Sequence, residues 1–346
     1  MSDPPIRQCI RRSGPARAPR YHLRGRAVTD PGEVKRLNAL RVPPRYTDVC
    51  FNEDPRAPLQ ATARDTRGRL QYRYSEASIR HNASAKFRRL LRFAKLLPRL
   101  RGAPLPRVGG GGGGGAGGDE KRHMVAQAVR LLDQCHFRVG NPKYLKENRS
   151  YGLSNLEVGH ASVGRGKGNI SFPGKTGKRN TCEVTDPVTL AFLRKAIKRH
   201  NPKERLFGYT SRTGKRAEIR PIDINRFLQS FDAQISAKDF RTWQANVELL
   251  RQLAAVPAQE RSARPERALR GALEAAAASL NNTPAVCKSN YIHPMVLELF
   301  RGDPAGFDRL MRPYTKLSAS TRASHRTGTL ETVLYRMLRQ FHSDRD

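Results

Sequence analysis

The chain has 346 residues, with 65 Lys and Arg against 30 Asp and Glu, and therefore a formal net charge of +35. This excess of positive charge is more than solubility requires and indicates a polyanion as the partner. No apolar run approaches the ~18 residues of a membrane-spanning helix, and residues 1–5 lack the apolar core of a secretory signal. We therefore expect an intracellular protein without a membrane segment, long enough for two domains.

The cysteines are odd in number and widely scattered along the chain. They are Cys9, Cys50, Cys135, Cys182 and Cys287. Their spacing matches neither a metal site nor a disulfide framework. We expect five reduced thiols and no bound metal.

The N-terminal part of the chain divides by composition. Residues 1–28 are rich in Arg and Pro and poor in large apolar side chains, which is typical of a disordered basic arm. Three strand-like stretches follow, at 46–51, 59–65 and 70–74, separated by turn signals. We predict a small β-rich domain over 29–80.

The strand-like stretch 70–74 alternates aromatic residues with polar and basic ones. Gln71 and Arg73 lie on one face of such a strand, and Tyr72 and Tyr74 lie on the other. One interpretation is an ordinary half-buried strand with its tyrosines in the core. The other is a strand whose polar face contacts DNA bases or phosphates, as a β-ribbon in the major groove does.

A long glycine run interrupts the helical part of the chain. Residues 109–118 are glycine at all but one position, so we predict a flexible insertion over 102–118. It is not a phosphate-binding loop, because no Gly-Lys-Ser/Thr sequence follows it. Amphipathic stripes predict one helix over 86–97 and a second from Asp119.

The rest of the chain is predicted to be mostly helical. Residues 168–184 have the pattern of a β-hairpin, with a tight turn at 173–178. Helical patterns dominate beyond Pro221. We therefore predict an α+β protein, in which a larger, mostly α-helical domain with a β-hairpin spans 81–346.

One tyrosine follows a strong helix-start signal. Thr283 supplies a capping hydroxyl, and Pro284 occupies the first helical position. The short helix that begins there would place Tyr291 just past its end, in a defined direction. In so basic a chain this phenol is a candidate nucleophile for a phosphodiester, although most tyrosines are packing residues.

Attack by a phenol on a phosphodiester needs three kinds of help. Arginines stabilise the extra negative charge of the transition state, and a lysine or histidine protonates the leaving 5′-oxygen. Nearby positive charge helps the phenol, whose unperturbed pKa is about 10, to lose its proton. Arg138 at a helix end, Lys175 at a hairpin tip and Arg241 in a core-anchored helix are candidates. Residue type alone does not distinguish them from other basic side chains.

Four segments together resemble the type IB DNA topoisomerases of the poxvirus and bacterial kind. The segments are 59–74, 137–153, 238–243 (KDFRTW) and 282–294 (NTPAVCKSNYIHP). The similarity extends from about Tyr46 to about Arg339. It implies a monomer whose two domains form a clamp around double-stranded DNA, and whose larger domain is catalytic.

The resemblance also implies a mechanism. In that family a tyrosine cleaves one strand, holds the 3′-phosphate covalently and reseals the strand after swivelling, which relaxes positive and negative supercoils without ATP, metal or another cofactor. By position, the nucleophile is Tyr291, the phosphate-binding arginines are Arg138 and Arg241, and the general acid is Lys175. Lys178 is close enough to be a rival general acid.

Other positions carry further implications. The DNA-gripping strands of the family correspond here to the segment with Gln71, Tyr72, Arg73 and Tyr74, and Tyr144 matches a tyrosine that touches DNA. Poxvirus enzymes carry a phosphate-binding histidine where this chain has Asn282, nine residues before the tyrosine. An asparagine amide can donate a hydrogen bond but carries no charge. We expect His293 to be a local structural group.

Two alternatives come from other classes of protein. A tyrosine site-specific recombinase uses a similar residue set, but its His-x-x-Arg pattern is absent at 238–241 (KDFR), and the β-rich first domain also argues against it. A non-enzymatic DNA-packaging protein would need only the positive charge, because binding through phosphates requires no active site.

Overall fold

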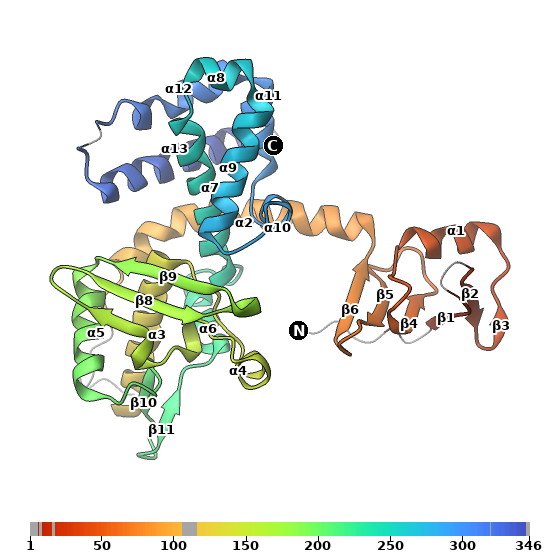
Figure 1. Cartoon of the computed structure of the whole chain (residues 1–346), viewed down its shortest axis with the longest axis horizontal. Helices are drawn as coiled ribbons and strands as arrows, with labels where there is room; N and C mark the ends of the chain where they lie inside the picture. Colours follow the sequence, from red (N-terminus) through yellow and green to blue (C-terminus); the bar gives the residue numbers. More distant parts are fainter. Residues whose placement is uncertain (1–5, 7–8, 16–17, 106–115, 319, 344–346) are drawn as a thin grey trace. The chain divides into compact units, whose positions relative to one another are not determined.

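The structure is a computed structural model that describes residues 6, 9–15, 18–105, 116–318 and 320–343. The chain divides into two compact units, Met1–Arg88 and Arg89–Asp346, which we describe one at a time (Figure 1). None of the helices in the described part of the chain combines the length and the apolar composition needed to traverse a bilayer.

The first unit is built on a six-stranded antiparallel sheet with strand order β3-β2-β1-β4-β5-β6. The strands are β1 (Cys9–Ser13), β2 (Arg20–Leu23), β3 (Arg26–Ala27), β4 (Thr47–Asn52), β5 (Leu59–Arg64) and β6 (Leu70–Tyr74). Helix α1 (Pro31–Ala39) starts at Asp30, whose carboxylate accepts a hydrogen bond from the Glu33 amide, and it adds Leu37 to the core. The predicted β-rich character of this region is confirmed, and β4, β5 and β6 match the three expected strands.

The expectation of a disordered arm over 1–28 is wrong for its described residues, because β1, β2 and β3 lie within it. Ile10 and Tyr21 are only 2% and 4% exposed and belong to the core of the unit. The guanidinium of Arg12 donates to backbone carbonyls, including that of Val42 at 2.7 Å. Arg12 therefore ties β1 to the loop between α1 and β4. Residues 1–5, 7–8 and 16–17 lie outside the described part of the chain.

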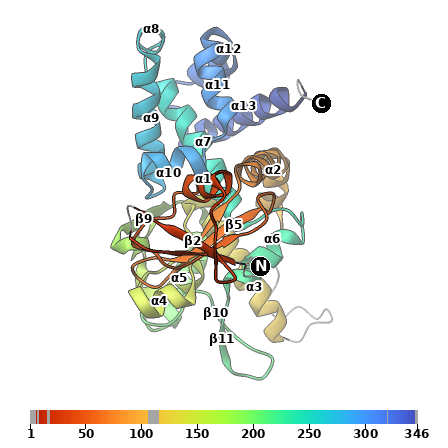
Figure 2. The ribbon, with the colours of Figure 1, turned by 90° about the vertical axis from the view of Figure 1, so that its right-hand side faces the viewer.

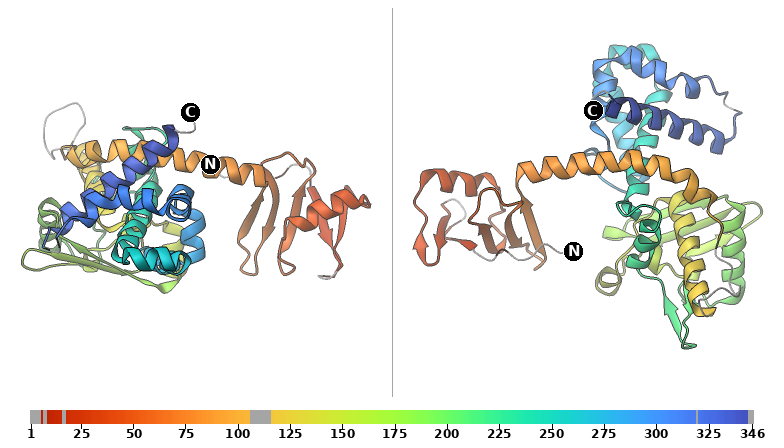
Figure 3. Two further views of the ribbon diagram at one scale, coloured as in Figure 1. Left: turned by 90° about the horizontal axis from the view of Figure 1, so that it is seen from above. Right: turned by 180° about the vertical axis from the view of Figure 1, so that it is seen from behind.

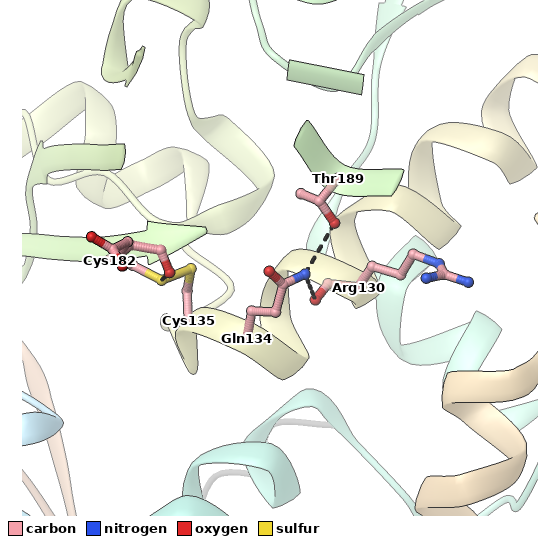
Figure 4. The surroundings of a disulfide bond; sticks show 6 residues. Arg130, Gln134, Cys135, Cys182 and Thr189 are labelled. Carbon is pink, nitrogen blue, oxygen red and sulfur yellow. Dashed lines mark hydrogen bonds between the residues drawn. A yellow bond between two sulfur atoms is a disulfide. The ribbon is translucent and has the colours of Figure 1, made fainter. Parts of the chain in front are cut away.

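The expectation of five reduced thiols is also wrong, because two disulfides form. Cys9 and Cys50 are bonded between the neighbouring strands β1 and β4, with their Cα atoms 5.2 Å apart. Cys135 and Cys182 are bonded with Cα atoms 5.5 Å apart (Figure 4). Cys287 is buried and free. The paired cysteines are 41 and 47 residues apart in sequence, so only the tertiary fold brings them together.

Helix α2 (Glu76–Gly102) is a single long helix that continues through Pro98 (Figure 3). Helix α3 starts at Ala116 and ends at Cys135, so residues 116–118 of the predicted flexible insertion are helical instead. Residues 106–115 of that insertion lie outside the described part of the chain.

The second unit contains two small sheets surrounded by helices. An antiparallel sheet has the order β7-β8-β9, and β10 pairs with β11 in a separate hairpin. These strands are β7 (Ala161–Val163), β8 (Gly168–Pro173), β9 (Arg179–Val184), β10 (Gly208–Thr210) and β11 (Arg216–Glu218). Helix α3 contacts β9, and α5 contacts β7 (Figure 1). The predicted hairpin over 168–184 is thus confirmed as β8–β9.

The remaining helices form the bulk of the second unit. They are α4 (Pro142–Asn148), α5 (Pro187–Arg199), α6 (Pro221–Gln229), α7 (Ala237–Ala255), α8 (Ala258–Ala263), α9 (Pro265–Ser279), α10 (Pro284–Asn290), α11 (Pro294–Gly302), α12 (Pro304–Thr315) and α13 (Ala323–Ser343). Helices α7 and α9 lie side by side, and α10 follows at the end of α9 (Figure 2). Helix α7 is buried along most of its length, with Phe240 and Trp243 in the core. The predicted α+β class is confirmed.

Candidate active site

Tyr291 occupies the position that the helix-start signal predicts. The Thr283 hydroxyl accepts a hydrogen bond from the Val286 amide, Pro284 is the first residue of α10, and Tyr291 caps the other end of the helix. The Tyr291 amide donates to the carbonyl of Cys287 at 2.9 Å. The side chain is 8% exposed, so the phenol is held among protein groups and is not free in solvent.

Asn246 on α7 fixes the backbone around this tyrosine. Its Nδ2 donates to the Tyr291 carbonyl at 2.8 Å and to the Thr242 carbonyl at 2.7 Å. Its Oδ1 accepts from the His293 amide at 2.8 Å. Because Asn246 is completely buried, these three bonds form without competition from water. His293 Nδ1 accepts from the Met295 amide at the start of α11, which agrees with the expected structural role of this histidine.

Arg241, five residues before Asn246 on α7, is 4% exposed and lies beside the phenol. Its guanidinium carbon is 5.6 Å from the centroid of the Tyr291 ring. Nη1 donates to the His136 carbonyl, and Nη2 donates to the Leu280 carbonyl at 2.7 Å. The Nε hydrogen is buried and has no partner among the described residues. A buried donor without a well-aligned partner is rare and costly, and the Arg241 side chain also interacts with the Tyr291 phenol.

Arg138 is held against Asn282. Its Nη2 donates to the Asn282 Oδ1 at 2.6 Å, which orients the amide and leaves the Asn282 Nδ2 buried without a partner in the described residues. Arg138 lies on a segment that packs closely against Gly152. A Cβ on Gly152 would lie 2.7 Å from the Arg138 carbonyl and 2.4 Å from the Cα of Gly140. Glycine at these two positions therefore allows the close approach that places Arg138.

The positive groups around Tyr291 act on its pKa. Burial raises the pKa of this phenol. The charge of Arg241, a hydrogen bond from its side chain, and the charges of Arg138 and Lys238 together outweigh burial and hold the pKa below its usual value of 10.0. The Lys238 Nζ is 5.7 Å from the centroid of the Tyr291 ring. A phenol with a lowered pKa loses its proton more readily during attack.

Lys175 and Lys178 both lie on the turn between β8 and β9, and both side chains are exposed. Neither ammonium makes a hydrogen bond or an ion pair within the described part of the chain. The turn itself is anchored, because the Ser150 hydroxyl donates to the Gly174 carbonyl at 3.2 Å and the Tyr151 amide donates to the Pro173 carbonyl at 2.9 Å. A free lysine on an anchored turn can reach a substrate, but the contacts do not favour one lysine over the other.

Sequence reasoning missed two groups of this site. Lys238 is three residues before Arg241, which places both on one face of α7, so helical periodicity could have identified it. Asn246 had no such signal, because a polar residue in a helix is normally taken as exposed. Tyr291, Arg138, Arg241 and Asn282 form one connected cluster, whereas Lys175 lies on the neighbouring turn.

The predicted DNA-contact residues of the first unit lie on β6. Tyr72 and Tyr74 stack on each other, with ring centroids 6.4 Å apart, and both are half-buried. Both faces of β6 are half-buried, so the two interpretations of this strand stay open. Gln71 donates to the Asp65 carboxylate at 3.0 Å, and Arg73 is also partly exposed.

Tyr144, in the second unit, is 50% exposed on the short helix α4. Half of its surface is therefore open to solvent. Groups of three or more His, Cys, Asp or Glu arranged to hold a metal ion are not found among the residues that the structure describes.

Comparison with known proteins gives the family. Residues 78–303 match the model of the eukaryotic DNA topoisomerase I catalytic core, and residues 20–65 match that of the bacterial DNA topoisomerase IB N-terminal domain. The chain is 28% identical to the DNA topoisomerase 1B of Acanthamoeba polyphaga mimivirus, over 80% of this chain and 82% of the viral protein. It is also 27% identical to the DNA topoisomerase 1 of Mycosarcoma maydis, over 36% of this chain and 14% of the fungal protein. Since the catalytic-core model alone covers more than half of the chain, the protein belongs to the type IB DNA topoisomerases, the isomerases that relax supercoiled DNA.

Proposed function

We propose that Tyr291 is the nucleophile of the relaxation reaction. The phenol gives its proton to solvent as its oxygen attacks a phosphodiester of one strand. A bond forms between the phenolic oxygen and phosphorus, and the bond from phosphorus to the 5′-oxygen breaks. The 3′-phosphate stays on the tyrosine until the 5′-hydroxyl reverses the step. The observation that carries this proposal is the phenol itself, buried beside three cations that lower its pKa.

Arg138, Arg241 and Asn282 are proposed to bind the nonbridging oxygens of that phosphate. The buried donors without partners, Arg241 Nε and Asn282 Nδ2, support this assignment because an anionic oxygen would satisfy both. Arginine also stabilises the pentacovalent transition state, in which the phosphate carries more negative charge than in the ground state. Asn282 supplies a neutral donor where poxvirus enzymes have a histidine, so the positive charge of this site comes from the arginines and Lys238.

Lys175 is proposed as the general acid that protonates the leaving 5′-oxygen, with Lys178 as the rival. Both lysines are exposed on the β8–β9 turn, and neither is engaged elsewhere in the described part of the chain. The reaction conserves the energy of the phosphodiester in the phosphotyrosine bond, so we propose that it needs neither ATP nor metal. We also propose that the enzyme acts as a monomer on double-stranded DNA.

We propose that the first unit grips DNA while the second unit cleaves it, so that the two together form a clamp. The partly exposed β6 residues Gln71, Tyr72, Arg73 and Tyr74 support the grip, as does the exposed Tyr144 on α4. The net charge of +35 supplies attraction to phosphates that does not depend on sequence.

The proposal is tested with purified protein and supercoiled plasmid in EDTA without ATP. Both positively and negatively supercoiled plasmid should be relaxed, and denaturation during the reaction should trap a covalent protein–DNA adduct at the 3′ end. Tyr291→Phe should bind duplex DNA normally and form no adduct. An adduct that persists in this variant would place the nucleophile on another residue.

A further inference from the structure

A pair of asparagines joins the turn that carries the candidate general acids to the cluster that carries the arginines. Asn281 lies between α9 and α10, and Asn180 lies on β9. The Asn281 Nδ2 donates to the Asn180 Oδ1 at 3.0 Å. The contact links residues 101 apart in sequence and is partly buried. The same Nδ2 also lies 3.5 Å from the Arg179 carbonyl.

On one side, Asn180 is part of the turn itself. Its Nδ2 donates to the Lys178 carbonyl at 3.2 Å, and the same carbonyl accepts from the Gly174 amide at 2.8 Å to close the turn around Lys175. A Cβ on Gly174 would lie 1.9 Å from the Asn180 Nδ2, so only glycine leaves room for this amide. The turn is therefore shaped around the Asn180 side chain.

On the other side, Asn281 lies between two residues that hold the arginines. The Leu280 carbonyl accepts from Arg241, and the Asn282 side chain accepts from Arg138. Asn281 has a left-handed backbone with φ 52°, a conformation that asparagine tolerates better than most residues. The side chain of Asn281 thus contacts the β8–β9 turn that carries Lys175 and Lys178, here called the lysine turn. Its backbone joins Leu280 and Asn282, the two residues that accept hydrogen bonds from the arginines.

We propose that Asn180 and Asn281 are positioning residues that set the lysine turn relative to the arginine cluster. The inference rests on the proposed function, in which a lysine of this turn protonates the leaving 5′-oxygen. Because neither lysine ammonium has a partner within the described residues, its position depends on the backbone of the turn. A shift of about 1 Å in a reacting group can lower a rate by about 100-fold. We therefore expect loss of the Asn281–Asn180 hydrogen bond to slow cleavage more than it destabilises the fold.

The test compares cleavage of two substrates under single-turnover conditions. One is an ordinary duplex, and the other has a 5′-bridging phosphorothiolate, whose sulfur leaves without needing a proton. Asn180→Ala removes the acceptor, whereas Asn281→Gly removes the donor and keeps the left-handed backbone. Both variants should cleave the ordinary duplex about 10- to 100-fold more slowly and recover the parent rate on the phosphorothiolate. Thermal midpoints confirm that both variants are folded, and the exposed Asn169 on β8, changed to alanine, is the matched control.

The outcomes separate this inference from the proposed function. Equal slowing of both substrates would mean that the pair acts on the arginines or on folding, and no slowing would mean that it has no role; either result overturns the inference. Lys175→Ala is measured in parallel. If it is rescued by the phosphorothiolate while the asparagine variants are not, the general acid stands and the inference fails. If only the asparagine variants are rescued, their positioning role stands and the acid is not Lys175.

Discussion

Replacement of Asn246 by alanine isolates the backbone support of the candidate nucleophile. The substitution removes three hydrogen bonds, those to the carbonyls of Thr242 and Tyr291 and that from the amide of His293. Asn246 is completely buried, so all three hydrogen bonds lie in the interior of the protein. The Tyr291 carbonyl and the His293 amide would then lack these partners, and the chain that leads into and out of the tyrosine would lose its support.

The expected loss of stability follows from these three hydrogen bonds. Each contributes a net ~1 kcal/mol, so the free energy of unfolding should fall by about 3 kcal/mol. For a domain of this size, that corresponds to a drop in the thermal midpoint of about 6–12 °C. Single-turnover cleavage, measured well below both midpoints, should fall by about 100-fold because the phenol is no longer held in line with the phosphate.

Asn246→Asp is the matched variant. It keeps the size of the side chain and the oxygen that accepts from the His293 amide, but it places a second oxygen against the Tyr291 carbonyl. It should therefore cleave as slowly as Asn246→Ala. If Asn246→Ala instead unfolds within about 2 °C of the parent chain and cleaves at the parent rate, Asn246 does not hold Tyr291, and the reasoning above is refuted.

Two further predictions concern charge and cross-linking in the second unit. Because Arg241, Arg138 and, least of the three, Lys238 lower the pKa of Tyr291, single-turnover cleavage should rise with pH to a midpoint below 10. Lys238→Met should move that midpoint to higher pH, and an unmoved midpoint would show that Lys238 does not act on the phenol. The Cys135–Cys182 disulfide closes a loop of 47 residues, so Cys135→Ser should lower the free energy of unfolding by about 4 kcal/mol in denaturant titrations. An equal stability of the variant and the parent chain without reductant would mean that this bond does not form.

Much of the fold could be predicted because hydrophobic periodicity depends on local sequence. The three strands of 46–74 and the β8–β9 hairpin were found in this way. The strands within 1–28 were missed because composition suggested solvated arginines, whereas Arg12 is bound by loop carbonyls that come from residues about 30 positions away. The disulfides were missed for the same reason, since Cys135 and Cys182 meet only through the contact of α3 with β9.

In the candidate site, too, local sequence predicted some features and tertiary packing determined the others. A helix-start signal located Tyr291, and family motifs located the two arginines, but neither indicates which groups surround the phenol. Asn246 reaches Tyr291 across the interface between α7 and the end of α10, and that interface is a tertiary contact. The bond from Arg138 to Asn282 spans 144 residues and likewise has no local signature. Local patterns therefore predicted candidate residues, while the geometry that joins them depended on packing.

The placement of Arg241 depends on two backbone turns that sequence patterns do not predict. His136, whose carbonyl accepts from Nη1, has φ 52°, and the Leu280 carbonyl that accepts from Nη2 is followed by Asn281, also with φ 52°. A left-handed conformation is unfavourable at residues other than glycine, less so at asparagine, and it persists where surrounding contacts enforce it. Here both turns direct carbonyls at one guanidinium, which fixes its plane and leaves Nε without a partner in the described part of the chain. The strained backbone is thus consistent with an arginine that is oriented for a phosphate before DNA binds, so that little reorganisation accompanies cleavage.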